Sequence, residues 1–99
     1  MSFKISRKVA EKLHDKHQVS ASEIQEAFLN REGGYFTDDR EDHRTDPPTW
    51  WFVSETDKGR TLKVVFVKYQ DRYQIKTAFQ PTDGSPALYA KLVQAAASS

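Results

Sequence analysis

The chain contains no cysteine, which excludes both a disulfide scaffold and a metal site built on thiolates. It also has no apolar run long enough to span a bilayer, and its first residues lead into charged positions rather than into an apolar signal core. These absences predict a cytoplasmic protein with no membrane segment.

Motifs for several common reaction types are absent as well. There is no glycine-rich phosphate-binding loop, no serine nucleophile elbow and no zinc motif. His14 and His17 stand at a helical i, i+3 spacing, but two ligands without a third make a poor metal site. We therefore expect no cofactor and no bound metal.

The chain is well supplied with bulky core material, having two Trp, four Tyr and six Phe in 99 residues. We expect a single domain over residues 1–99. Charge is uneven, because residues 20–57 carry three basic and ten acidic side chains whereas residues 58–99 carry seven basic and two acidic ones. This asymmetry favours one face for an anion and another for a cationic partner, with an ordinary mixed surface as the alternative.

Two helices are predicted in the first third of the chain. Apolar residues at helical spacing indicate a helix from Ser6, which is placed to cap it, to about His17. Ser20 and Glu23 have the spacing of a capping box and mark the start of a second helix. The two glycines at 33–34 are expected to end that helix.

The rest of the chain reads as a sheet followed by a helix. Residues 35–49 are polar and acidic and are expected to form a long, mostly irregular connection. Gly59 fits the left-handed position of a hairpin turn, and Ser85 opens a last helix that frays over residues 95–99. Aromatic and β-branched residues predict three strands, Trp50–Thr56, Thr61–Tyr69 and Arg72–Gln80.

The predicted fold class is therefore α+β, with two N-terminal helices, a three-stranded antiparallel sheet and a C-terminal helix. The apolar positions of these elements should converge in one core, namely Leu13, Phe28, Trp51, Val53, Leu62, Val64, Phe66, Ile75, Phe79 and Leu92.

Basic residues gather on the second and third predicted strands and their turns, at Lys58, Arg60, Lys63, Lys68, Arg72 and Lys76. A positive surface of this kind binds phosphates, and Tyr69 and Tyr73 are placed to stack on bases if they are exposed. Strand alternation means that the cations need not share a face. The alternative is a solvated outer face whose lysines discourage edge pairing.

Two histidines are candidates for proton transfer. His17 ends the first helix, and His43 lies in the acidic segment 38–46, where neighbouring carboxylates favour its imidazolium form. The alternatives are a histidine that stabilises its helix terminus and a charged, solvated loop.

Four short motifs resemble the BrnT toxins, small members of the RelE-like superfamily of type II toxin–antitoxin systems. They are Lys16-His17-x-Val19-Ser20-x-x-Glu23, then Phe28, then Asp38-x-Arg40-x-x-His43, and Gly59-Arg60-x-Leu62-Lys63-Val64-Val65-Phe66. The resemblance covers most of the chain and implies a RelE/BrnT-like fold, metal-independent RNA cleavage, and two partners: RNA, either free or on the ribosome, and an antitoxin protein. The chain departs from the family in Pro47-Pro48-Thr49-Trp50-Trp51 and in a C-terminal helix whose one basic residue is Lys91.

On this hypothesis a shallow cleft between helices and sheet holds the catalytic residues. His17 and His43 would transfer protons, while Arg60, expected to be an exposed cation, and Lys63 would stabilise the phosphate. The RNA-contacting cations would be Lys16, Lys68, Arg72 and Lys76. The alternative is a non-catalytic domain of the same fold that binds protein or nucleic acid.

Overall fold

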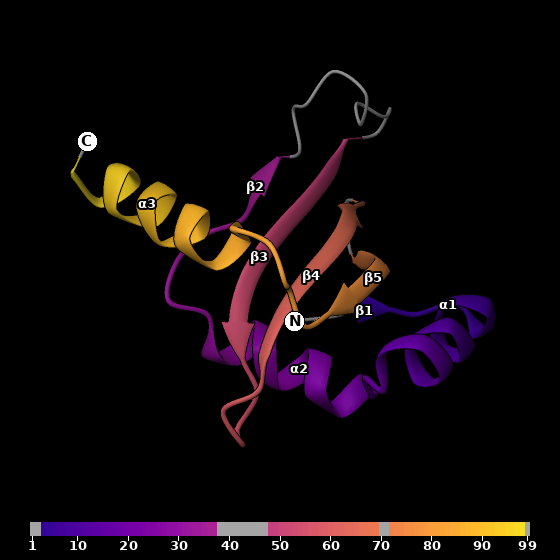
Figure 1. The fold of residues 1–99 in the computed structure, drawn as a ribbon. Helices are drawn as coiled ribbons and strands as arrows, with labels where there is room; N and C mark the ends of the chain where they lie inside the picture. The colour runs from indigo at the N-terminus through magenta and orange to yellow at the C-terminus, as the bar shows by residue number, and fades with distance from the viewer. Residues whose placement is uncertain (1–2, 38–47, 70–71, 99) are drawn as a thin grey trace.

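The structure is a computed structural model that describes residues 3–37, 48–69 and 72–98. Figure 1 shows the chain as a sheet with helices on both sides. Along the chain the elements are β1 (Phe3–Lys4), α1 (Arg7–Lys12), the π-helical η1 (Leu13–His17), α2 (Ala21–Asn30), β2 (Phe36–Thr37), β3 (Thr49–Glu55), β4 (Thr61–Lys68), β5 (Tyr73–Phe79) and α3 (Ser85–Ser98).

The sheet has five strands in the order β1-β5-β4-β3-β2. β1 runs parallel to β5, and the other pairs are antiparallel. The α+β class, the two N-terminal helical segments and the C-terminal helix are confirmed. The three predicted strands also form and pair antiparallel, but the prediction that they make up the whole sheet is wrong, because the sheet is a mixed one of five strands. The extra strands are two residues long, too short to show an alternating pattern, and their pairing depends on partners distant in sequence.

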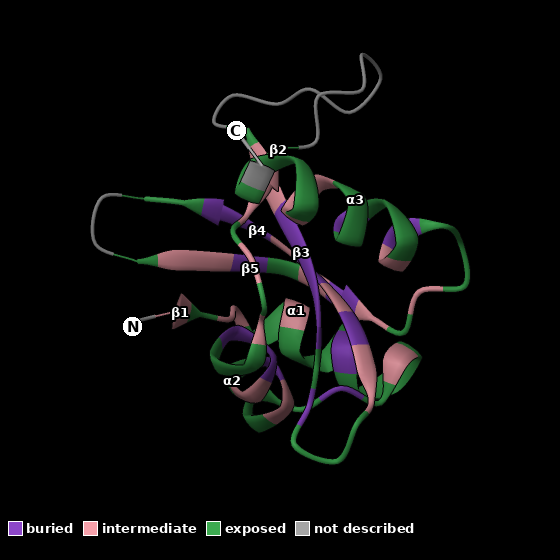
Figure 2. Cartoon of the chain, turned by 90° about the vertical axis from the view of Figure 1, so that its left-hand side faces the viewer, coloured by how far each residue is buried: buried purple, intermediate pink, exposed green. Residues whose placement is uncertain are grey.

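The helical segments divide between the two faces of the sheet. The two N-terminal ones contact β3, β4 and β5, while α3 crosses β3 on the other face (Figures 1 and 2). The main core lies beneath α2, where the Phe28 ring stands 4.7 Å from Phe52 and 5.5 Å from Phe66. The largest fully buried side chains are Phe28, Phe52, Phe66, Leu13, Ile24, Leu62, Ile75 and Val64.

Helix starts follow the sequence signals. The Ser6 hydroxyl accepts a hydrogen bond from the Val9 N–H at 3.2 Å. Both halves of the Ser20–Glu23 capping box form, as predicted. The first helix does end at His17, but its last turn is π-helical, and Gln18 then takes a left-handed conformation with φ of 51°.

The glycines at 33–34 do not end α2, which stops at Asn30 and is followed by an extended Arg31. Glycine is needed at 33 for space, because a Cβ there would collide with the Val93 side chain of α3. The Tyr89 hydroxyl donates to the Gly34 carbonyl at 2.8 Å. Residues 33–34 therefore pack against α3. This helix continues to Ser98, past residue 95, where fraying was predicted to begin.

An irregularity in the β4–β5 ladder changes which residues of β5 face the main core. Phe66 pairs with Ile75, but the preceding Val65 pairs with Thr77, so one residue of β5 is skipped. Ala78, opposite Val64, is consequently fully buried and Phe79 is only half-buried. The predicted place of Phe79 in the buried core is wrong for this reason, and Leu92 likewise packs only partly buried against the core.

Candidate nucleic-acid interface

Arg60 is bound into the fold at the end of the first helical segment. Its guanidinium Nη1 donates to the Gln18 carbonyl at 2.6 Å and to Glu23 Oε2 at 2.9 Å, and Nη2 donates to the His17 carbonyl at 2.7 Å. Only 23% of its side chain is exposed. The expectation of an exposed cation is wrong, because carbonyls freed where η1 ends lie beside the β3–β4 hairpin.

The partner carboxylate of Arg60 is held in its charged form. Burial alone raises the pKa of Glu23, but hydrogen bonds from Arg60 and Ser20 outweigh it and lower the pKa below its ordinary value. Glu23 also receives the Ser20 N–H at 3.1 Å, so it joins the capping box to the ion pair. Arg60 would have to release these contacts before it could grip a phosphate with its full donor set.

Lys63 lies on the α3 side of the sheet. Its Nζ donates to the Ser85 hydroxyl at 3.0 Å and stands 4.8 Å from the centre of the Trp51 ring. The Ser85 N–H donates to Asp83 Oδ1 at 2.9 Å, and the hydrogen bonds from Ser85 lower the pKa of Asp83. Lys63 thus fastens the start of α3 to β4, on a different face from Arg60.

The predicted catalytic set is therefore only partly brought together. His17 meets Arg60 through its main-chain carbonyl, and its half-buried ring lies 5.7 Å from the Phe79 ring. Lys63 is directed to other partners. His43 and the rest of its acidic segment lie outside the described residues.

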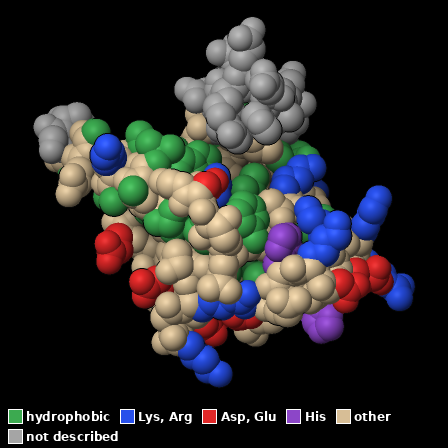
Figure 3. All heavy atoms as spheres, viewed as in Figure 1, with side chains coloured by type: hydrophobic (Ala, Val, Ile, Leu, Met, Phe, Trp, Pro, Cys, Tyr) green, Lys and Arg blue, Asp and Glu red, His purple; other side chains and the backbone are tan. Residues whose placement is uncertain are grey.

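The cations predicted to contact RNA are exposed. Lys16 is exposed on η1, Lys68 and Arg72 lie at the two strand ends that face each other across the β4–β5 turn, and Lys76 is exposed on β5. Figure 3 shows Lys and Arg side chains gathered on the side of the molecule formed by β5 and α1, with histidine and some Asp and Glu side chains among them. A phosphate backbone would meet positive charge along this side.

Aromatic rings and cations meet at one end of the sheet. Lys68 Nζ stands 4.3 Å from the centre of the Trp50 ring and 5.8 Å from that of Tyr35. One pair further along the same strand ends, beyond the Lys68–Tyr73 pair, the Arg72 guanidinium lies 5.5 Å from the ring of Tyr69, which is 45% exposed. We call this region the aromatic–cation surface and define it by Tyr35, Trp50, Lys68, Tyr69, Arg72 and Tyr73.

The two tyrosines predicted to stack on bases differ in accessibility. Tyr69 is open to solvent, whereas Tyr73 is half-buried and its ring packs 5.6 Å from Tyr35. Burial, with Tyr73 adding to it, raises the pKa of Tyr35 to about 12, even though Arg31 acts to lower it. Tyr35 is itself half-buried, so Tyr69 is the ring of this surface that is most open to a base.

Trp50 and Tyr35 were not among the predicted site residues. The β3–β4 register pairs Trp50 with Phe66 and so brings it close to Lys68, two residues further along β4. That register cannot be read from the sequence alone. Tyr35 lies in a segment predicted to be irregular. The tryptophan pair at 50–51 was the one available signal, since strand alternation sends two adjacent rings to opposite faces.

The described residues hold no group of three or more side chains suited to binding a metal ion. His14 Nδ1 instead lies 3.1 Å from Asp15 Oδ1 on the exposed side of η1. Among the described helices none is long and apolar enough to cross a membrane.

The chain matches no known protein-family model, and no curated protein is significantly similar to it in sequence.

Proposed function

We propose that this protein binds single-stranded RNA through the aromatic–cation surface, as a toxin-like RNA-targeting protein whose natural partner is a neutralising antitoxin. The observation that carries the proposal is the pairing of Arg72 with the exposed ring of Tyr69 next to Lys68. Proteins that bind single strands combine cations that follow the phosphates with aromatic rings on which the bases stack.

Single-stranded RNA suits this surface better than a duplex does. The bases of a duplex are stacked on one another, so a ring such as Tyr69 can receive a base only where the strand is open. Lys76 is an exposed cation on β5, further from the strand end than Arg72. It offers a contact for a phosphate next to the base that stacks on Tyr69. Several Lys and Arg contacts of this kind would make the affinity fall steeply with salt.

The binding experiment uses a fluorescently labelled, unstructured RNA 12-mer of mixed sequence and follows its anisotropy. Tyr69→Ala should weaken binding by about 5- to 150-fold, the range expected for one lost base stack of about 1–3 kcal/mol. Lys68→Ala should weaken it and flatten the salt dependence. The matched control is Lys58→Ala, since this exposed lysine lies in the hairpin at the other end of β4. Equal affinity for all four proteins would refute the proposed surface.

Metal-independent RNA cleavage is the second candidate, and the position of His17 favours it. Arg60 holds the His17 carbonyl, the imidazole lies 5.7 Å from the Phe79 ring, and Lys16, the preceding residue in the chain, is exposed. A fixed imidazole of this kind can take the proton of a 2′-hydroxyl as its oxygen attacks the adjacent phosphorus and expels the 5′-oxygen, which a second group must protonate. Lys16 would then offset the negative charge that develops on the phosphate.

Cleavage is tested with the same RNA in the presence of a chelator and without the antitoxin. His17→Ala should abolish the appearance of new RNA ends, whereas His14→Ala, an exposed histidine of the same helical segment, should leave the rate unchanged. If the wild-type protein binds the RNA tightly but leaves it intact, cleavage is refuted and the protein is the non-catalytic binding domain. Cleavage that survives His17→Ala would contradict the assignment of this residue.

A further inference from the structure

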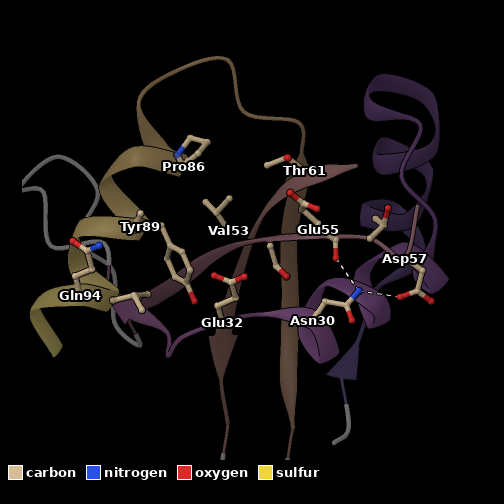
Figure 4. Close-up of a pocket in the computed structure, with 13 residues that line it drawn as sticks. Asn30, Glu32, Val53, Glu55, Asp57, Thr61, Pro86, Tyr89 and Gln94 are labelled. Carbon is tan, nitrogen blue, oxygen red and sulfur yellow. Dashed lines mark hydrogen bonds between the residues drawn. The ribbon is translucent and has the colours of Figure 1, made fainter. Parts of the chain in front are cut away.

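A groove lies away from the aromatic–cation surface, between α3, the β3–β4 hairpin and the end of α2 (Figure 4). Its volume is about 780 Å³. That is the size of a site for a drug-sized ligand or a short peptide segment rather than for an ion.

The groove combines an apolar wall with an acidic rim. Val53 of β3 and Tyr89 of α3 supply apolar surface, and Pro86 closes one end. Glu32, Glu55 and Asp57 supply three carboxylates, all on exposed residues, and no lysine, arginine or histidine is among the lining residues. The charge complement of such a groove is a cation carried on an apolar stem.

Part of the rim is already fixed in position. The Asn30 amide donates to Asp57 Oδ1 at 2.9 Å and to the Glu55 carbonyl at 3.0 Å, drawn as dashed lines in Figure 4. The Asp57 N–H in turn donates to Glu26 Oε1 at 2.9 Å. Within the described residues no hydrogen bond or ion pair engages the side chains of Glu32 or Glu55, so their carboxylates remain for a ligand.

We propose that this groove binds a basic segment of a partner protein, with an arginine or lysine side chain laid against Val53 and Tyr89 and its charged head at Glu32 and Glu55. A segment of a few residues fits the volume, which a single amine would leave largely empty. Arginine is the better match, because its planar donors pair with carboxylates and its stem packs on apolar surface. This inference does not depend on RNA binding.

The test titrates the full chain with three probes and monitors binding through the amide NMR signals of the protein. The probes are a capped hexapeptide of alternating arginine and leucine, the same peptide with citrulline in place of arginine, and free spermidine. The arginine peptide should give saturable shifts at Val53, Asp57 and Tyr89, and the citrulline peptide should bind at least about tenfold more weakly, because the rim charges then have no partner.

Variants locate the binding energy. Glu32→Gln combined with Glu55→Gln should weaken the arginine peptide by about tenfold, since two rim contacts are lost. Glu11→Gln is the control, because this carboxylate pairs with Arg7 on α1. Equal binding of the citrulline peptide, shifts confined to other elements, or an equal loss in the control would overturn the proposal. Spermidine binding as tight as that of the arginine peptide would overturn the peptide assignment in favour of a free polyamine.

Discussion

Replacing Arg60 by alanine removes the contact that joins the β3–β4 hairpin to the first two helical segments. Three hydrogen bonds from one guanidinium disappear, and Glu23 keeps its charge without its main partner. Hydrogen bonds to charged groups contribute about 1.5–3 kcal/mol each when buried, and water entering the gap would recover part of this. We therefore expect a loss of about 2–4 kcal/mol in the free energy of unfolding and a fall of about 10–20 °C in Tm.

The assay is urea unfolding followed by the fluorescence of the two tryptophans. Arg60→Lys should recover only part of the loss, since an ammonium cannot reach both carbonyls and the carboxylate with the same planar geometry. Lys58→Ala, an exposed change in the same hairpin, should stay within about 0.5 kcal/mol of the wild type. An Arg60→Ala protein as stable as this control would refute the described network of contacts.

Four further predictions concern stability and titration. The folded pKa of Glu23 lies below its ordinary value of 4.5, so its contribution to the free energy of unfolding is present above that pH and should be lost as pH falls below it. Urea unfolding at a series of pH values should show this loss in the wild type and not in Glu23→Gln. In an absorbance titration, the phenol of Tyr35 should ionise at a pH of about 12, and a set of tyrosines all titrating near 10 would contradict its burial. Gly33→Ala should destabilise the protein by collision with Val93, and adding Val93→Ala should restore part of the loss in Tm. Phe66→Ala should cost about 3–5 kcal/mol in denaturant unfolding, and a cost below about 1 kcal/mol would place this ring outside the core.

Local signals explain which parts of the fold the sequence predicts. The Ser20–Glu23 capping box and the left-handed Gly59, with φ of 83°, depend on residues adjacent in the chain, and both are confirmed. β1 and β2 depend on distant partners, with Phe3 paired to Tyr73 and Phe36 to Trp51, and were not predicted. A segment of two residues has no period to detect.

The candidate site shows the same division. The positive charge of Lys68 and Arg72 is plain in the sequence, whereas their aromatic neighbours follow from strand register. Arg60 looks like any other surface cation in the sequence, because its partners are main-chain carbonyls more than 40 residues away, exposed by a π-helical turn. The charge of a residue can be read from the sequence, but hydrogen-bond partners that lie far away along the chain cannot.

The most direct test of the proposed function is to find where RNA touches the protein. A 4-thiouridine RNA 12-mer is cross-linked by light to the full chain, and the modified peptides are identified by mass spectrometry. The aromatic–cation surface predicts cross-links at Tyr69, abolished by competitor RNA and by high salt. Cross-links confined to α3, or none above those given by a non-binding protein, would contradict RNA binding at this surface.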